Sequence, residues 1–229
     1  MQTSFDFPFL DHYLSSDFLV SAENSTAYNF ISNYNLQNQN LPRIFALWGK
    51  NSCGKTHLAH IWQRRMAAEF LRIEEIEDCE IANFISSNQC YIVEDVENIQ
   101  NQIVLFHLFN IIIEKNCCLM LTSNVALNRI EYDFADLASR LKNVFAIEIK
   151  DPEIDFIKML LVKQFAIKQL LVEDKVIDFL AKNIDRNYQR IMEIVRLLEF
   201  YCFEEKRKIT IPFITEILGK LKSSCHPEG

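Results

Sequence analysis

The sequence predicts an α/β fold in which a parallel, doubly wound sheet is followed by a small all-helical domain. Short apolar runs alternate with helical segments in the first part of the chain, and such runs are typical of strands buried on both faces of a parallel sheet. After residue 150 only helical periodicity continues. The predicted strands cover residues 44–48, 90–93 and 117–122, and the helical segments between them cover residues 56–69 and 102–115.

The helical domain is predicted from four segments that repeat apolar residues at i, i+3 and i+4 beyond Lys150-Asp151-Pro152. Earlier in the chain, the Asn- and Gln-rich residues 32–40 run into Leu41-Pro42, a composition that favours turns, and we expect a surface loop there. The predicted organisation is an N-terminal segment, an α/β domain, a helical domain and a tail, with the bounds 1–12, 13–150, 151–222 and 223–229.

The composition excludes some classes of partner. The net charge is −7, from 24 Lys and Arg against 31 Asp and Glu, which is opposite to the basic surface that binds DNA phosphates and disfavours direct, sequence-specific DNA binding. Seven cysteines without a CxxC pair indicate a reducing compartment. The first residues lack the pattern of a signal peptide, and no apolar run reaches the roughly 18 residues of a membrane span. We therefore expect a cytoplasmic protein without membrane association.

A phosphate-binding loop is predicted where the first strand ends and a helix begins. The motif Gly-x-x-x-x-Gly-Lys-Thr has a mechanism in this context: backbone N–H groups surround a β-phosphate, the lysine neutralises charge, and the threonine hydroxyl reaches Mg²⁺. The alternative, a plain strand-to-helix turn, requires no Lys-Thr pair after the second glycine. The candidate nucleotide-binding residues are Gly49, Lys50, Asn51, Ser52, Cys53, Gly54, Lys55 and Thr56.

Polar residues follow the second and third predicted strands, at the edge where the carboxyl ends of parallel strands meet. Glu94 and Asp95 follow the second strand, and Asn124 follows the third. In P-loop proteins such acids lie beside the metal ion and the attacking water. Thr56 and Glu94 are therefore candidate Mg²⁺ ligands, and Asn124 is a candidate contact of a γ-phosphate. Surface acids and a turn asparagine are the ordinary alternatives.

Other residues near the loop are expected to have no chemical role. His57 and His60 lie at i and i+3 without a third ligand in sight, so we expect them to pack and assign no metal other than Mg²⁺. Cys53 lies at the start of a helix, a place that can lower the pKa of a thiol. A tolerated spacer residue is the simpler interpretation.

Several motifs resemble the AAA+ family of the bacterial replication initiator DnaA and its short regulatory homologue Hda. The likeness extends from residues 13–24 to the end of the predicted helical domain. Leu-Ala-Ser-Arg-Leu at 137–141 and Ile-Thr-Ile-Pro-Phe at 209–213 are more specific than the phosphate loop, which many families share. The resemblance implies an AAA+ P-loop domain with a helical lid that binds ADP or ATP with Mg²⁺. The other motifs that carry it lie at 54–58, 106–110 and 121–124.

The same resemblance implies a regulator of replication initiation that promotes hydrolysis of DnaA-bound ATP together with the sliding clamp. Arg140 would act in trans as an arginine finger on the ATP of the partner, with a surface salt bridge as the alternative role. The nucleotide-sensing arginine of the lid falls at or beside Gln189, with Arg186 and Arg190 as candidates, of which we select Arg190. The implied partners are DnaA and the clamp, and the assembly can include a homodimer.

The N-terminal residues resemble the clamp-binding peptide Gln-Leu-x-Leu-x-Leu. Its candidate partner-binding residues here are Gln2, Phe5 and Phe7, and Thr3 departs from the pattern. The alternative is a terminal strand that packs its phenylalanines on the domain. In DnaA a DNA-binding helix-turn-helix domain follows the lid, whereas only residues 222–229 remain here, so we expect the regulator rather than the initiator.

One departure from the family concerns catalysis in the chain's own site. The family order places an aspartate first, whereas this chain has Glu94 before Asp95, so the carboxylates differ in reach by one methylene and we expect weak hydrolysis. Two other functions stay open: an independent ATPase that remodels nucleic acid or protein, and an adaptor that uses nucleotide as a structural ligand. Turnover by the isolated protein would favour the first, and unchanged function after Arg140→Ala would favour the second.

Overall fold

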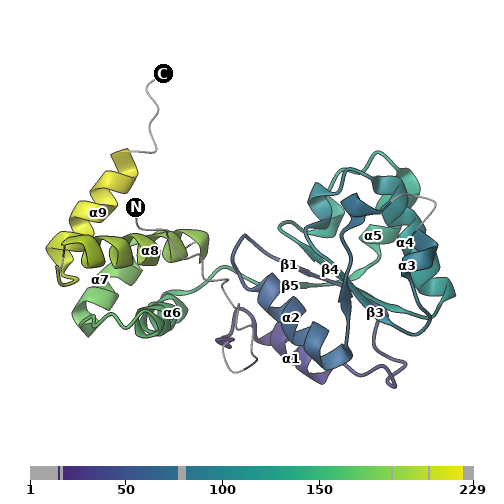
Figure 1. Ribbon diagram of the computed structural model, residues 1–229, viewed down its shortest axis with the longest axis horizontal. Coiled ribbons are helices and arrows are strands. Elements are labelled where there is room, and N and C mark those ends of the chain that lie inside the picture. Colours follow the sequence, from purple (N-terminus) through teal and green to yellow (C-terminus); the bar gives the residue numbers. More distant parts are fainter. Residues whose placement is uncertain (1–14, 16–17, 77–80, 187, 206, 224–229) are drawn as a thin grey trace, which may run out of the picture.

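The computed structural model describes residues 15, 18–76, 81–186, 188–205 and 207–223, which form an α/β part and a separate helical part (Figure 1). The sheet is wholly parallel, with the strand order β2-β3-β4-β1-β5. This arrangement confirms the predicted fold class. The strands are β1 (Ile44–Trp48), β2 (Glu69–Phe70), β3 (Cys90–Val93), β4 (Cys118–Ser123) and β5 (Phe145–Glu148).

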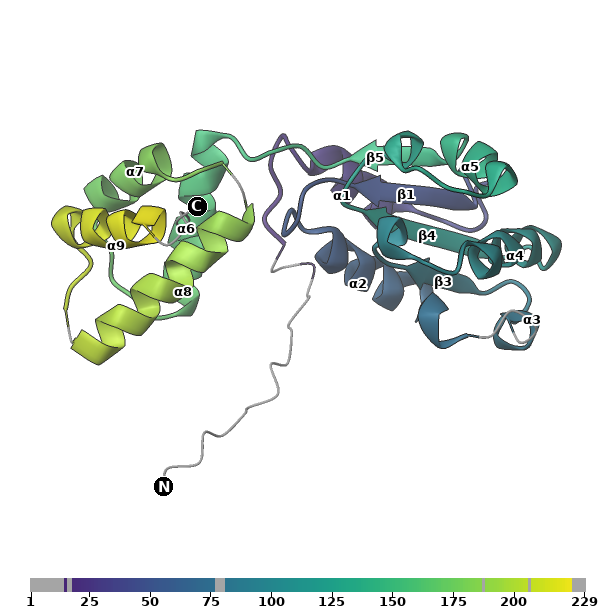
Figure 2. The ribbon, with the colours of Figure 1, turned by 90° about the horizontal axis from the view of Figure 1, so that it is seen from above.

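Helices cover both faces of the sheet (Figure 2). One face carries α1 (Ser25–Asn33) and α2 (Lys55–Met66), which contact each other and the strands. The other carries α3 (Ile81–Phe84), α4 (Gln102–Glu114) and α5 (Ala135–Lys142), together with short 3₁₀ turns. The turns are η2 (Ile73–Glu75), η3 (Val96–Asn98) and η4 (Leu127–Arg129).

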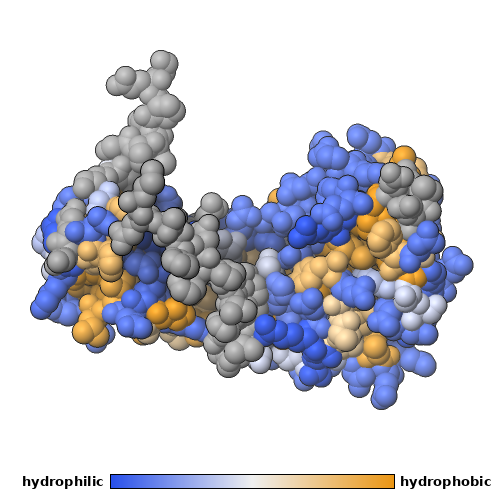
Figure 3. Space-filling view, viewed as in Figure 1, coloured by the Kyte–Doolittle hydropathy of each residue, from blue (hydrophilic) through white to orange (hydrophobic). Residues whose placement is uncertain are grey.

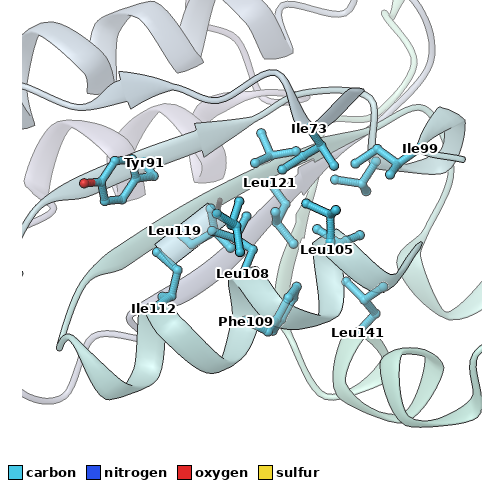
Figure 4. Packing of buried hydrophobic residues seen from close by; sticks show 14 of the residues in the cluster. Ile73, Tyr91, Ile99, Leu105, Leu108, Phe109, Ile112, Leu119, Leu121 and Leu141 are labelled. Atoms are coloured by element: carbon cyan, nitrogen blue, oxygen red, sulfur yellow. The ribbon is translucent and has the colours of Figure 1, made fainter. Parts of the chain in front are cut away.

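Alternating strand residues supply the two cores. In β1, Phe45 and Leu47 pack under α1 and α2, whereas Ala46 between them packs under α4. All three side chains are fully inaccessible to solvent. They enter different cores because successive side chains of a strand point to opposite faces of the sheet. Figure 4 shows the core beneath α4, to which the strands contribute Tyr91, Leu119 and Leu121, and the helices Leu105, Leu108, Phe109, Ile112 and Leu141.

Two strands and two α-helices, α1 and α3, were not predicted from the sequence, and α3 has only four residues. Strand β5 lies at an edge of the sheet and buries only Ile147, although the sequence has a short apolar run over 144–147 that was not used to predict it. Strand β2 has two residues, too few for a pattern. Helix α1 buries only Ala27 and Ile31 among residues that favour turns. The predicted loop over 32–40 is therefore wrong at its start, because α1 continues to Asn33.

Tyr34 also departs from the predicted loop. Its ring is buried against Phe45 and Trp62, at centroid distances of 5.2 and 5.7 Å. Its hydroxyl donates to the carbonyl oxygen of Pro42 at 2.8 Å. Residues 35–40 are exposed, as expected for a surface loop. The aromatic ring anchors this loop to the sheet, a role that the composition of the stretch does not indicate.

The helical part has a core of its own. It consists of α6 (Ile154–Ile167), α7 (Asp174–Asn183), α8 (Tyr188–Glu205) and α9 (Ile211–Ser223). Some large apolar side chains stay on its surface, including Leu171 at 98% and Phe203 at 82% exposure, and Figure 3 shows apolar patches among the hydrophilic surface. No helix in the described ranges is long and apolar enough to cross a membrane. Its core includes Ile157, Leu161, Leu180, Ile191, Leu198 and Phe213.

Glu23 joins the segment before α1 to the beginning of the helical part. Its carboxylate Oε1 accepts from the N–H of Glu153 at 3.1 Å, and its carbonyl oxygen accepts from the N–H of Lys150 at 3.2 Å. Burial alone would raise the pKa of Glu23, but hydrogen bonds from Ser21, from its own N–H and from Glu153 N–H hold the pKa below its usual value of 4.5. The ionised form is therefore favoured in the folded state.

We expect Glu23→Gln to lower the free energy of unfolding by about 1.5 kcal/mol at pH 7, since a charge-assisted hydrogen bond is lost. Because the folded-state pKa is depressed, the wild-type advantage exists above pH 4.5 and disappears as the pH falls through the folded-state pKa. Urea unfolding at pH 7 and at lower pH measures both effects. The matched control is Glu204→Gln, an exposed glutamate of α8. Equal stabilities of the two variants at pH 7 would contradict the assignment.

Candidate functional site

The predicted site residues of the α/β part meet at the carboxyl edge of three adjacent strands. Strand β1 leads into the glycine loop (residues 49–54), β3 into Glu94, and β4 into Asn124. The order β3-β4-β1 makes these ends neighbours. Ligands of open α/β sheets bind outside this edge, where the strand order reverses. The structure brings four of the candidate residues together here: Lys55 contacts Asn124, and Thr56 contacts Glu94.

The glycine loop has a conformation that requires its glycines. Gly54 adopts φ +106°, and a Cβ atom on it would lie 2.9 Å from the Phe18 ring. A Cβ atom on Gly49 would lie 2.5 Å from the carbonyl oxygen of Ile149, a main-chain atom that cannot move aside. The N–H of Gly49 donates to the carbonyl oxygen of Ser123 at 3.1 Å, which fixes the loop to the end of β4. Close packing around the loop therefore selects both glycines.

Lys55 lies at the centre of this arrangement. Its side chain is buried, and its Nζ donates to the carbonyl oxygens of Gly49 at 2.7 Å and Lys50 at 3.2 Å. A third donor reaches Oδ1 of Asn124 at 2.8 Å. All three partners are neutral oxygens, so the ammonium charge is solvated but not neutralised. An anion at the mouth of the loop would complete its environment.

Thr56 and Glu94 form an oxygen pair suited to Mg²⁺. The Thr56 hydroxyl donates to Oε1 of Glu94, and the two oxygens are 2.7 Å apart. Neighbouring ligands of an octahedral Mg²⁺ are about 3.0 Å apart, given metal–oxygen distances of about 2.1 Å. The pair can therefore hold the ion with little movement. When bound, Mg²⁺ would supply positive charge to phosphate oxygens beside Lys55.

Asp95 has a different environment from Glu94. Its backbone is left-handed, at φ +51°, and its N–H donates to the Thr122 hydroxyl at 3.1 Å. Burial and the neighbouring Glu97 raise the pKa of Asp95, and Lys55 opposes them. The strained turn directs the two successive carboxylates to different places. Only Glu94 reaches Thr56.

Glu97 is a site residue that the sequence analysis missed. Its Oε1 accepts from the backbone N–H of Asn124 at 3.0 Å and from Nδ2 of the same residue at 2.5 Å. The sequence does place Glu97 three residues after Glu94. Because Glu97 lies in the 3₁₀ helix η3, its side chain returns to the edge of the sheet at which Glu94 lies. Nothing in the sequence identified Asn124 as its partner, because the two residues are separated by a helix and a strand.

The remaining loop residues line the mouth of the site. Lys50 forms an exposed ion pair with Asp151 at 2.5 Å, and Asn51 and Ser52 are exposed. Cys53 is buried, and burial raises the pKa of its thiol, so its position at a helix start does not make it a thiolate. It packs in the core beneath α2 and is more than a spacer.

Both histidines of α2 contact aromatic rings, as expected from the sequence. The His57 ring lies edge-on to Phe18 with centroids 5.1 Å apart. The His60 ring lies 4.9 Å from that of Phe70, and its Nδ1 is 3.0 Å from Oε1 of Gln63. These contacts stabilise α2 against the segment before α1 and against β2.

Arg140 lies on the opposite face of the sheet from α2. Its guanidinium stacks on the Phe106 ring of α4 at 4.6 Å from the centroid, and the described part of the chain offers it no ion pair. Phe106 also lies edge-on to Phe134 at 4.8 Å. In place of the alternative role, a surface salt bridge, the structure shows a cation–π contact, which restricts the guanidinium while leaving its N–H groups available.

The structure describes the candidate residue of the helical part, Arg190, but not the N-terminal candidates. Arg190 pairs with Glu193 at 2.7 Å on α8. Tyr188, two residues earlier, packs on Phe156 and donates from its hydroxyl to the carbonyl oxygen of Lys150 at 3.4 Å. It therefore connects α8 to the segment that follows β5 and to the start of α6. The predicted clamp-binding residues Gln2, Phe5 and Phe7 lie outside the described residues.

The sequence is similar to those of replication initiators. Residues 157–218 match the family described as Hda, lid domain. The chain is 26% identical to the chromosomal replication initiator protein DnaA of Buchnera aphidicola subsp. Cinara cedri, over 92% of this chain and 53% of the relative. DnaA of Buchnera aphidicola subsp. Baizongia pistaciae is 25% identical over 77% of this chain and 44% of the relative. The chain spans about half the length of these curated relatives.

Solved structures of DnaA share the fold. Domain III of Thermotoga maritima DnaA has a TM-score of 0.77 at 17% identity, covering 93% of this chain and 98% of that one. AMPPCP-bound DnaA from Aquifex aeolicus has a TM-score of 0.69 at 21% identity, covering 86% and 68%. The parallel sheet and its helices thus match the AAA+ domain of DnaA, and the helical part is consistent with the lid match.

Gly49→Ala should disrupt the loop, because the added Cβ would lie 2.5 Å from the carbonyl oxygen of Ile149. We expect a loss of about 1 to 3 kcal/mol in the free energy of unfolding, the usual cost of overpacking. Gly219→Ala in α9 is the matched control, since its Cβ would meet no atom within 4 Å and alanine favours a helix. Chemical denaturation measures both. Similar stabilities for the two variants would show that the close approach is absent in solution.

Proposed function

We propose that this chain, a DnaA/Hda-like AAA+ protein, binds ADP or ATP with Mg²⁺ and regulates replication initiation by promoting hydrolysis of ATP bound to DnaA, together with the sliding clamp. The observation that carries the proposal is the separation of its functional groups. Helix α2, which follows the glycine loop, and α5, which carries Arg140, pack on opposite faces of one sheet. A loop that binds a nucleotide and an arginine directed elsewhere suit a protein that acts on a partner's nucleotide.

Nucleotide binding is supported by charge and geometry. The Lys55 ammonium is buried among neutral oxygens and would gain a phosphate as counter-ion. Thr56 and Glu94 already have nearly the oxygen spacing of an Mg²⁺ site. Helix α2 begins directly after the loop, so its first N–H groups and dipole face the same place. Lys50, Asn51 and Ser52 would form the rim of the phosphate site.

Action in trans is supported by the contacts of Arg140. Phe106 holds the guanidinium against α4, and Phe106 belongs to the face that carries α5. The N–H groups that are not used in the stack can donate to phosphate oxygens of a neighbouring molecule. A restricted guanidinium loses less entropy on binding than a free one. Arginine fingers of this kind accelerate phosphoryl transfer about 10³- to 10⁵-fold.

Further parts of the proposal concern the partners and the compartment. Gln2, Phe5 and Phe7 would bind the clamp as apolar and polar anchors of a short peptide. The net charge of −7 favours recruitment through a protein over direct DNA binding. Arg190, which pairs with Glu193 on α8, is the residue of the lid that would respond to the nucleotide. Self-association as a homodimer would use the same face as Arg140. The protein would act in the cytoplasm.

Lys55→Ala is expected to weaken ADP and ATP binding about a hundredfold, because charge-assisted hydrogen bonds to phosphate are lost. The control is Lys182→Ala, an exposed lysine of α7. Isothermal titration calorimetry with Mg²⁺ present provides both affinities. Undiminished ADP affinity in Lys55→Ala would refute the phosphate site. The thermal stabilisation by ADP should disappear in the same variant, since a ligand stabilises only the state that binds it.

Arg140→Ala should leave ADP affinity unchanged and reduce the stimulation of ATP hydrolysis by DnaA about a thousandfold. The assay uses purified DnaA with and without DNA-loaded clamp. Arg140→Lys should restore little, because lysine lacks the planar fork. Phe106→Leu should retain partial stimulation, and Lys142→Ala, an exposed cation of the same helix, should retain all of it.

Each alternative outcome identifies a different function. Weaker ADP binding by Arg140→Ala with unchanged stimulation would place the residue in the local site. Stimulation that needs no arginine would favour an adaptor. Rapid hydrolysis by the isolated wild-type protein, lost in Glu94→Gln, would favour an independent ATPase. Stimulation that does not depend on the clamp would remove the clamp from the proposal.

A further inference from the structure

The side chain of Asn124 is held between two groups of opposite hydrogen-bonding character. Its Oδ1 accepts from Nζ of Lys55 at 2.8 Å, and its Nδ2 donates to Oε1 of Glu97 at 2.5 Å. An ammonium can only donate, and a carboxylate can only accept. These two partners therefore determine which way the amide faces. Its oxygen faces Lys55 and its NH₂ group faces Glu97.

This orientation matters at the position of a third phosphate. A phosphate group accompanying Lys55 presents only acceptor oxygens, so it needs donors around it. Asn124 instead presents an acceptor toward Lys55. Turning the amide by half a rotation would offer its NH₂ group to the phosphate. The same rotation would bring Oδ1 against the Glu97 carboxylate, where two acceptors would repel each other.

Within the described residues, the Glu97 carboxylate depends on Asn124 for its hydrogen bonds. Within the described residues its Oε2 is buried without a hydrogen-bond partner, so Asn124 supplies the donors to this carboxylate through one oxygen. The buried hydroxyl of Tyr132 is also without a hydrogen-bond partner among the described residues. Burial raises the pKa of Tyr132, and the nearby Glu97 carboxylate raises it further. A buried carboxylate that loses a donor is costly. The amide is thus held strongly in place.

We propose that Glu97 is a positioning residue that locks the Asn124 amide with its oxygen toward Lys55 and so makes the site discriminate against a nucleoside triphosphate relative to the diphosphate. The inference rests on the proposed binding of nucleotide at Lys55. It assigns the discrimination to a residue that touches neither phosphate nor metal. Gln at this position would remove the lock, because its amide can donate to or accept from Asn124 in either orientation.

The test compares two affinities in one protein. Calorimetry with Mg²⁺ measures the dissociation constants of ADP and of a non-hydrolysable ATP analogue for the wild type, Glu97→Gln and Glu131→Gln. Glu131 is an exposed glutamate before α5, so its variant carries the same charge change without the contact. We expect Glu97→Gln to raise the affinity for the analogue about tenfold relative to ADP, corresponding to one hydrogen bond. Glu131→Gln should keep the wild-type ratio.

A double-mutant cycle separates positioning from a general structural effect. In the Asn124→Ala background, Glu97→Gln should no longer change the ratio of the two affinities, because the amide that it orients is missing. An unchanged ratio in the single variant, or the same change in both backgrounds, would overturn the role of Glu97. Absence of any nucleotide binding by the folded wild type would overturn the proposed function as well, whereas binding with a ratio insensitive to Glu97 overturns only this inference.

Discussion

The buried ammonium of Lys55 is the constraint on which the site depends. A buried ammonium needs an acceptor for each of its N–H groups, and here two main-chain carbonyl oxygens and one amide oxygen accept from it. The carbonyls reach Nζ only because the glycine loop folds back over α2, and that path requires Gly49 to approach Ile149. The amide oxygen is available only because β4 ends beside β1. The hydrogen bonds of Lys55 Nζ therefore depend on both the sheet register and the loop conformation.

The position of β1 between β4 and β5 helps to explain why the glycine loop and Arg140 are apart. Its alternating residues supply both cores, so helices on each face are held to the same strand. The loop that leaves β1 turns into α2 on one face, whereas the connection from β4 to β5 places α5 and Arg140 on the other. One sheet thus carries the glycine loop at its edge and, on α5, the guanidinium that stacks on Phe106. This separation is a property of the strand order.

The sequence predicted features that depend on local pattern and missed those that depend on register. The continuous run in β4 and the motif ending in Lys55 and Thr56 were visible because each is contiguous. Glu97 was not, because its role arises only when η3 and the end of β4 lie side by side. The cation–π contact of Arg140 with Phe106 likewise joins two helices across 34 positions of the sequence. Neither composition nor periodicity contains such information.

The helical part is attached where a bound nucleotide would affect it. Phe156 packs in the core beneath α2, whereas the next residue, Ile157, packs in the core of the helical part, so α6 belongs to both. Tyr188 and Glu23 add hydrogen bonds at the same junction. The ion pair of Lys50 with Asp151 is exposed and contributes little stability. Because the partner of Lys50 in this pair, Asp151, lies three residues before α6, the glycine loop and the start of the helical part are joined through this contact.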